Sequence, residues 1–225
     1  MNEQRLTIAE IHQWLKSRID TGSQLTFDYR SQVFSTTDAN GIFELALPLI
    51  FPPLNGEHAI DAAAQFQTQS PTAIILLIQA GYAALGYCEG DALVHHKMVK
   101  KYMVRQSQGK SQLTYRKSKG KSRLGSRIRL HNSVVFFEEI NQTLRNWNVL
   151  PGCNRILMSL PVNLTNLLYS ANVPPPFQKK DPRIRKIPFN VKTPSYKELC
   201  HIHWEATHGR LVQKESADSI LQNWA

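Results

Sequence analysis

A continuous apolar run in the middle of the chain constrains the fold more than any other feature. Residues 73–79 are aliphatic up to the final Gln79, which is typical of a strand buried on both faces of a sheet. Gly81 interrupts the run, residues 82–87 form a second apolar segment, and residues 92–104 form a third whose later half is cationic. Because only a few residues separate these segments, the sequence predicts an antiparallel meander.

Helical patterns flank this meander. Thr7 and Glu10 form a capping-box pattern at the start of a predicted helix over 7–19, and apolar residues three or four apart predict another over 129–147. The remaining assignments are two or three strands with loops in 21–69, an exposed loop over 106–126, a strand over 155–160, a stiff linker from Pro174 and a helix beginning near Ser195.

Together these elements predict a mixed α/β fold. The 225 residues, 42% of them hydrophobic, suffice to bury a sizeable core. We expect three parts: an appended α+β subdomain over 1–68, a mixed-sheet domain with helices over 69–210, and a C-terminal tail helix over 211–225.

The positive charge is unevenly distributed. The chain has 27 Lys and Arg against 17 Asp and Glu, and 12 of the basic residues lie in the segment 92–137, which contains no acidic residue. Such a segment repels itself and favours a polyanionic partner, with nucleic acid as the first candidate. A solvated basic loop is the simpler alternative, and an anionic membrane is disfavoured because no apolar face accompanies the charge. The candidate RNA-binding residues are Lys97, Lys100, Lys101, Arg105, Arg116, Lys117, Lys119, Lys121, Arg123 and Arg129.

A short polar motif lies inside this basic segment. Gly109, Lys110, Ser111 and Gln112 place a glutamine next to small residues, where it can enter a narrow cavity. Its amide can orient a water, a hydroxyl or a carbonyl without titrating. Gln112 is therefore the candidate catalytic residue, although such tetrapeptides also occur in ordinary loops.

Several other classes of protein fit poorly. Three widely spaced cysteines without a CxxC pair argue against a disulfide scaffold or a zinc ribbon and fit a reducing compartment. His95 and His96 should point to opposite faces of their strand, so no metal site and no cofactor are expected. No apolar stretch reaches the roughly 20 residues of a membrane span, and the N-terminus lacks a signal-peptide pattern, so we expect a cytoplasmic protein.

Several spaced residues resemble a known family. The first group, in the basic segment and the helix after it, is His96-Lys97, Tyr102, Val104-Arg105, the motif 109–112, Gly120, Gly125-Ser126, Arg129 and Asn132. The second group is Asp181-Pro182-Arg183, Ile187-Pro188, Pro194-Ser195-Tyr196 and Glu198-Leu199. Over roughly 70–208 the chain resembles the VLRF-type release-factor-like domain, which is related to the middle domain of eukaryotic and archaeal peptide-release factors.

The resemblance implies a function at the ribosome. Family members free stalled nascent chains at the CCA end of peptidyl-tRNA, either by ester hydrolysis or by cutting the tRNA just before that end. Gln112 would occupy the position of the family's catalytic-loop glutamine, with Gly109 and Ser111 shaping the loop. The expected partners are the large ribosomal subunit and peptidyl-tRNA, without DNA or membrane. The chain would be a compact, stand-alone bacterial member.

A non-catalytic alternative follows from departures from the family pattern. Lys110 stands where related loops have a small residue, His131 replaces a tyrosine and Ser133 replaces a glutamate. The alternative is therefore a ribosome- or tRNA-binding factor that keeps the fold and lacks the chemistry.

Overall fold

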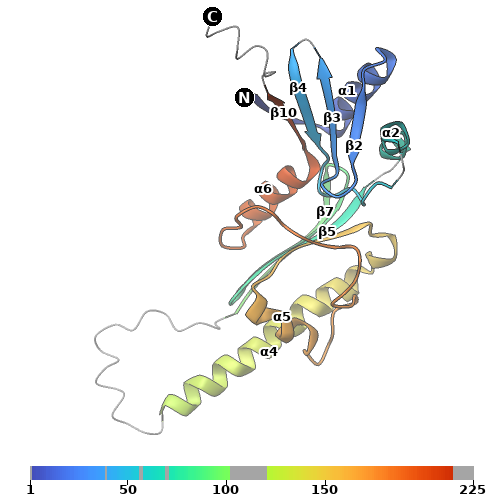
Figure 1. Cartoon of the computed structure of the whole chain (residues 1–225). Coiled ribbons are helices and arrows are strands. Elements are labelled where there is room, and N and C mark those ends of the chain that lie inside the picture. Colours follow the sequence, from blue (N-terminus) through green and yellow to red (C-terminus); the bar gives the residue numbers. More distant parts are fainter. Residues whose placement is uncertain (1, 39, 56–57, 69–70, 102–120, 215–225) are drawn as a thin grey trace, which may run out of the picture. The chain divides into compact units, whose positions relative to one another are not determined.

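The computed structural model describes residues 2–38, 40–55, 58–68, 71–101 and 121–214, with the backbone alone at 67–68 and 121–131. It contains two compact units. The first combines residues 1–73 with 89–92 and 201–225, and the second comprises residues 74–88 and 93–200. Figure 1 shows the course of the chain and labels its elements. The mixed α/β fold predicted from the sequence is confirmed.

The first unit holds an antiparallel sheet of five strands in the order β1-β10-β4-β3-β2. Their bounds are β1 Asn2–Leu6, β2 Leu25–Asp28, β3 Val33–Asp38, β4 Gly41–Ala46 and β10 Gly209–Lys214. β10 lies at the C-terminal end of the described chain and pairs with two strands. Gln213 pairs with Asn2 of β1, and Arg210 pairs with Ala46 of β4.

Two helices, α1 (Ile8–Asp20) and α2 (Ala59–Thr68), complete this unit. Thr7 caps α1 with the predicted capping box, in which its side chain and that of Glu10 each accept a backbone N–H. Ile11 and Leu15 of α1 are fully buried, as is Phe66 of α2. The apolar spacing of α1 therefore produces the packed face that the sequence predicted.

Nearly all of the second sheet lies in the second unit, with the order β7-β6-β5-β8-β9. The strands are β5 Thr72–Gln79, β6 Tyr82–Glu89, β7 Ala92–Lys100, β8 Arg155–Ser159 and β9 Ile184–Lys186. The two-residue connections from β5 to β6 and from β6 to β7 require the predicted antiparallel meander. β8 and β9 pair in parallel. The central residues of β5 are fully buried, as its uninterrupted aliphatic sequence predicted.

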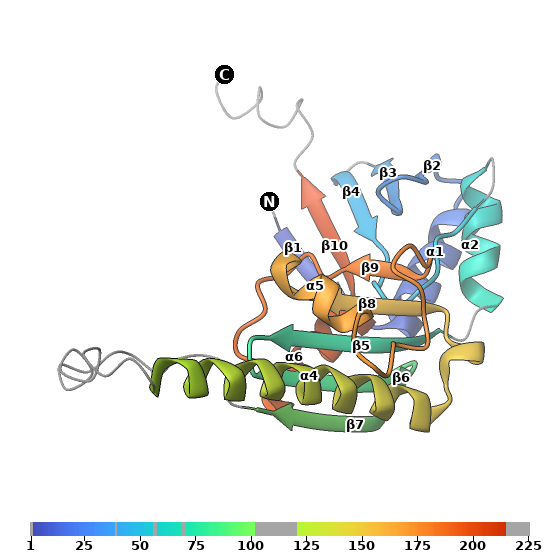
Figure 2. The ribbon, with the colours of Figure 1, turned by 90° about the horizontal axis from the view of Figure 1, so that it is seen from below.

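Helix α4 (Lys121–Trp147) lies along one face of this sheet (Figure 2). Phe136, Phe137, Ile140 and Leu144 of α4 share one core with side chains of β5, β6 and β8. The other helices are the short 3-10 turn Leu150–Gly152, α5 (Val162–Tyr169) and α6 (Tyr196–Thr207), the last of which is divided between the two units.

Three assignments from the sequence need correction. The predicted loop over 106–126 is wrong for residues 121–126, which belong to α4 despite Gly125; a single glycine costs a helix only about 1 kcal/mol, which a long packed helix tolerates. The predicted tail helix over 211–225 is wrong for residues 211–214, because β10 gains backbone pairing on both sides. The segment 21–69, assigned to strands and loops, also contains the helix α2. The domain limits at 68 and 210 stay predictions.

Candidate nucleic-acid interface

Most of the candidate site residues lie outside the described part of the chain. They are Arg105, Gly109, Lys110, Ser111, Gln112, Arg116, Lys117 and Lys119, in the connection between β7 and α4. Lys121, Arg123 and Arg129 lie in α4, where the backbone alone is described. Their predicted roles therefore stay predictions. Lys97, Lys100 and Lys101 can be examined directly.

Lys97 and Lys100 lie in the C-terminal half of β7, an edge strand of the second sheet, and Lys101 directly follows it. Lys97 and Lys100 are exposed, and neither forms an ion pair within the described residues. The Lys100 ammonium lies 5.3 Å from the centre of the Tyr82 ring, in a cation–π contact. Lys101 instead pairs with Glu139 of α4 at 3.1 Å. The charge available to a ligand therefore comes from Lys97 and Lys100, just before the connection that contains Gln112.

Aromatic rings accompany these lysines. The His95 ring stacks on both Tyr87, with centroids 6.0 Å apart, and Trp147 of α4, at 5.7 Å. The His96 ring instead contacts Tyr196 of α6 at 4.8 Å. The neighbouring histidines thus have different ring partners, as alternation along a strand requires. Among the described residues, no group of three or more His, Cys, Asp or Glu could hold a metal ion.

The sequence did not single out Tyr82, and it named Tyr196 only as part of the family resemblance, not as a site residue. Both are partly exposed, with 38% and 51% of their surface accessible. A hydrogen bond with the Cys200 thiol raises the pKa of Tyr196 above its ordinary value. Their positions carried a weak signal, because Tyr82 opens a strand and Tyr196 follows the Ser195 cap of a helix, but the sequence did not show that they flank β7.

The Asp181-Pro182-Arg183 segment has a structural role. Arg183 donates to both carboxylate oxygens of Asp181, at 3.0 and 2.8 Å, and to the carbonyls of Leu150 and Cys153. This hydrogen bonding lowers the pKa of Asp181 and raises that of Arg183. Much of the donor capacity of Arg183 is therefore engaged within the protein, where it connects the segment before β9 to the turn before β8.

Ser195 and Glu198 also build the fold. The Ser195 hydroxyl accepts the backbone N–H of Glu198 at 3.1 Å and so caps the helix that the sequence predicted to begin near Ser195. The buried Glu198 carboxylate accepts the backbone N–H of Lys192 at 2.8 Å. These contacts fix the start of α6, and with it the position of Tyr196.

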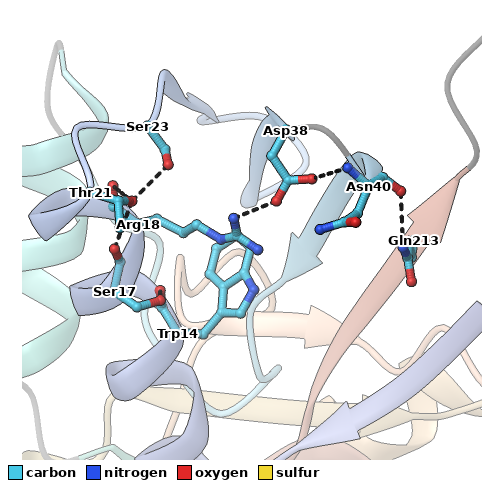
Figure 3. Close-up of polar contacts among 8 residues, drawn as sticks. All are labelled: Trp14, Ser17, Arg18, Thr21, Ser23, Asp38, Asn40 and Gln213. Carbon is cyan, nitrogen blue, oxygen red and sulfur yellow. Dashed lines mark hydrogen bonds and ion pairs between the residues drawn. The ribbon is translucent and has the colours of Figure 1, made fainter. Parts of the chain in front are cut away.

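A separate polar cluster lies in the first unit (Figure 3). Arg18 of α1 pairs with Asp38 at 2.6 Å, and its guanidinium lies 5.5 Å from the Trp14 ring and 5.0 Å from the Phe43 ring. Asp38 also accepts the backbone N–H of Asn40, which lowers the pKa of the carboxyl. The cluster holds the connection between β3 and β4 against α1 and has no feature that indicates chemistry.

A family model decides which family this fold and surface belong to. Residues 73–214, more than half of the chain, match the family described as the Bacteroidetes VLRF1 release factor, bVLRF1. The chain belongs to the bVLRF1 family. The matched region includes β5 to β10 and the connection that contains Gln112. The family resemblance predicted from the sequence is thus confirmed, whereas a bacterial source stays a prediction.

Two curated relatives of this bVLRF1 chain are named as tRNA endonucleases. The human tRNA endonuclease ANKZF1 is 24% identical over 174 residues, which cover 75% of this chain and 23% of the human protein. The tRNA endonuclease vms1 of Schizosaccharomyces pombe is 25% identical over 122 residues, which cover 53% of this chain and 20% of that protein. The chain therefore spans less than a quarter of the length of these relatives.

A solved structure supports the fold. The Vms1 mitochondrial localization core is similar with a TM-score of 0.53 at 14% identity, and the match covers 91% of this chain and 84% of that one. The mixed α/β architecture is therefore shared with the Vms1 core. None of the helices in the described ranges is long and apolar enough to cross a membrane.

Proposed function

We propose that this bVLRF1 chain cleaves peptidyl-tRNA at its CCA end and thereby frees stalled nascent chains. The observation that carries the proposal is the family match over residues 73–214, which includes the acid-free basic segment and its GKSQ motif. Relatives named as tRNA endonucleases support cleavage chemistry at the level of the family. With this substrate, the protein would act in a compartment that contains ribosomes, and the large ribosomal subunit would be its partner.

Gln112 is the proposed catalytic residue. Its side-chain amide would orient the attacking oxygen, which requires a donor and an acceptor held in place and no change in protonation. In ester hydrolysis, a water oxygen bonds to the peptidyl carbonyl carbon, the ester bond breaks and the 3′ oxygen of the tRNA takes a proton. In tRNA cleavage, a ribose 2′-hydroxyl attacks the adjacent phosphorus and the 5′ oxygen of the next nucleotide leaves with a proton.

The basic residues would place the substrate. Lys97 and Lys100 are exposed at the end of β7, immediately before the connection that contains Arg105, Lys110, Gln112 and Arg116. Their charges would neutralise phosphates on either side of the scissile bond, which raises affinity and fixes the position of the RNA. Lys101 contributes less, because Glu139 partly neutralises it.

Lys110 favours one alternative, a factor that binds the ribosome or tRNA without cleaving. A lysine beside the motif's serine changes the size and charge of the segment that would approach the bond to be cleaved. This alternative predicts the same salt-sensitive binding and no product.

The two functions differ in the products of a single reaction. Purified stalled ribosome–nascent-chain complexes are incubated with the full chain, and the tRNA and the peptide are each resolved on gels. Ester hydrolysis yields free peptide and full-length tRNA, whereas tRNA cleavage yields a shortened tRNA and a peptide that carries the CCA nucleotides. Either result supports the proposal. Binding to the complexes without either product would support the non-catalytic alternative and contradict cleavage.

A further inference from the structure

We propose that exposed rings beside β7 form a stacking platform for unpaired RNA bases, a role that rests on the proposed function and specifies how its substrate is held. The β7 platform consists of Tyr82, His96, Lys100 and Tyr196. It comes from three elements of the second unit, β6, β7 and the start of α6. Its residues are all described and do not belong to the GKSQ motif.

The platform depends on the close approach of α6 to the sheet. A Cβ atom at Gly86 of β6 would lie 3.0 Å from Leu199 of α6, so the glycine allows the helix to pack directly on the strand. That packing brings Tyr196, at the first position of α6, to 4.8 Å from the His96 ring, with the two rings tilted by 46°. Tyr196 still exposes 51% of its surface and His96 is also exposed, so both residues remain accessible to solvent.

The second part of the platform lies nearer the end of β7. Tyr82 exposes 38% of its surface, and the Lys100 ammonium lies 5.3 Å from its ring centre. This combination suits a nucleotide, because the base can stack on the ring and the ammonium can pair with the phosphate. Exposed rings alone would suit many ligands, whereas rings with a lysine that has no described ion-pair partner suit a nucleic acid.

The charge around the platform supports RNA over a protein segment. The carboxylate nearest in sequence to Tyr196, that of Glu198, is buried and accepts the Lys192 N–H, and Glu139 pairs with Lys101. The chain from 92 to 137 adds no acidic residue. The RNA must be unpaired, because the base faces of a duplex are already stacked on one another. The CCA end of the proposed substrate meets this requirement.

Binding of oligonucleotides to the full chain tests the platform. Fluorescence anisotropy is measured with a labelled 12-nucleotide oligo(A) single strand and with a labelled 12-base-pair RNA duplex. We expect Tyr196→Ala to weaken binding of the single strand about tenfold and binding of the duplex much less. Tyr196→Phe, which keeps the ring, should restore the single-strand affinity. Trp204→Ala is the matched control, because Trp204 is similarly exposed, at 45%, and lies in the first unit.

Two results would overturn the platform: an unchanged affinity of Tyr196→Ala for the single strand, or an equal loss for single strand and duplex. A second measurement does not depend on the folding of a variant. A 4-thiouridine oligonucleotide is cross-linked to the wild-type chain, and the modified peptides are identified by mass spectrometry. Cross-links at Tyr82, His96 or Tyr196 support the platform, and cross-links that leave all three unmodified contradict it.

Failure of this inference is distinguishable from failure of the proposed function. If the platform is wrong, Tyr196→Ala binds oligo(A) normally while the wild type still cleaves peptidyl-tRNA. If the proposed function is wrong, the wild type yields no product although its oligo(A) binding still depends on Tyr196.

Discussion

At the residue scale, the side chains that carry the family pattern divide into those that build the fold and those proposed to act on RNA. Asp181, Arg183, Ser195 and Glu198 hydrogen-bond within the protein, and Arg183 also reaches the carbonyls of a turn distant in sequence. The sequence grouped these positions as part of one family resemblance. It did not indicate their task, because the carbonyls that Arg183 meets lie 33 and 30 residues away in the chain.

Replacement of Arg183 by lysine should destabilise the fold. An ammonium cannot reproduce the planar, two-pronged contact with Asp181 and reach the two carbonyls as well. We expect the free energy of unfolding to fall by about 2 kcal/mol, within the range for charged hydrogen bonds. Urea unfolding followed by circular dichroism measures it. Lys180→Arg, at an exposed neighbouring position, is the control and should leave the midpoint unchanged.

The same contact predicts a pH dependence. The hydrogen bonds from Arg183 hold the pKa of Asp181 below its ordinary 3.8. A lowered folded-state pKa means that the ionised carboxylate stabilises the fold above that ordinary value, and that this contribution is lost as the pH falls through the lowered pKa. Wild type should therefore be more stable than Asp181→Asn at pH 7, and the difference should shrink below pH ~4. A constant difference from pH 7 to pH 2.5 would show that the charge of Asp181 contributes nothing.

At the scale of elements, the strongly patterned segments were predicted, whereas β1, β9, β10 and the helix α2 were missed. The aliphatic run of β5, the capping box of α1 and the apolar stripe of α4 are local signals, and each is present in the structure. β9 has three residues and β1 has five, so neither can show a period of its own. Their strand conformation comes from partners far away in sequence, β8 for one and β10 for the other.

β10 offers a test of such long-range pairing. A Cβ atom at Gly209 would lie 2.6 Å from Ile11 of α1 and 3.0 Å from the carbonyl oxygen of Ala46 in β4. Because the carbonyl belongs to a paired strand and cannot move freely, Gly209→Ala should lower the stability by about 2 kcal/mol. Thermal unfolding measures the loss. Gly152→Ala, where a Cβ meets nothing within 4 Å, should leave the unfolding temperature close to that of the wild type.

At the scale of the whole molecule, the excess of ten positive charges comes from basic side chains in two different environments. Lys97 and Lys100 face solvent at the end of β7, and their role in binding RNA stays a prediction. Arg155 is almost completely buried, and this burial lowers its pKa to about 10. Sequence could locate the dense basic segment. It could not separate exposed charges from those used in the interior, because burial and pairing depend on segments brought together only by folding.

The exposed charges predict salt-sensitive binding. Five phosphate contacts, from Lys97, Lys100, Arg105, Lys110 and Arg116, would give a slope of about −3.5 for the logarithm of affinity against the logarithm of salt concentration on single-stranded RNA. Affinity for oligo(A) should then fall about 100-fold between 50 and 200 mM salt, and Lys97→Gln should reduce the slope by about 0.7. A slope near zero would exclude phosphate contacts as the source of binding.

Release of peptide by a Gln112 variant tests the proposed catalytic role most directly. Single-turnover rates of nascent-chain release from stalled ribosome complexes are compared for wild type, Gln112→Ala and Gln108→Ala, a matched glutamine four residues earlier in the same segment. We predict that Gln112→Ala releases peptide about 100-fold more slowly than wild type while binding the complexes equally well. Gln108→Ala should remain close to the wild-type rate. Equal release by wild type and Gln112→Ala would contradict the proposed catalytic role of Gln112.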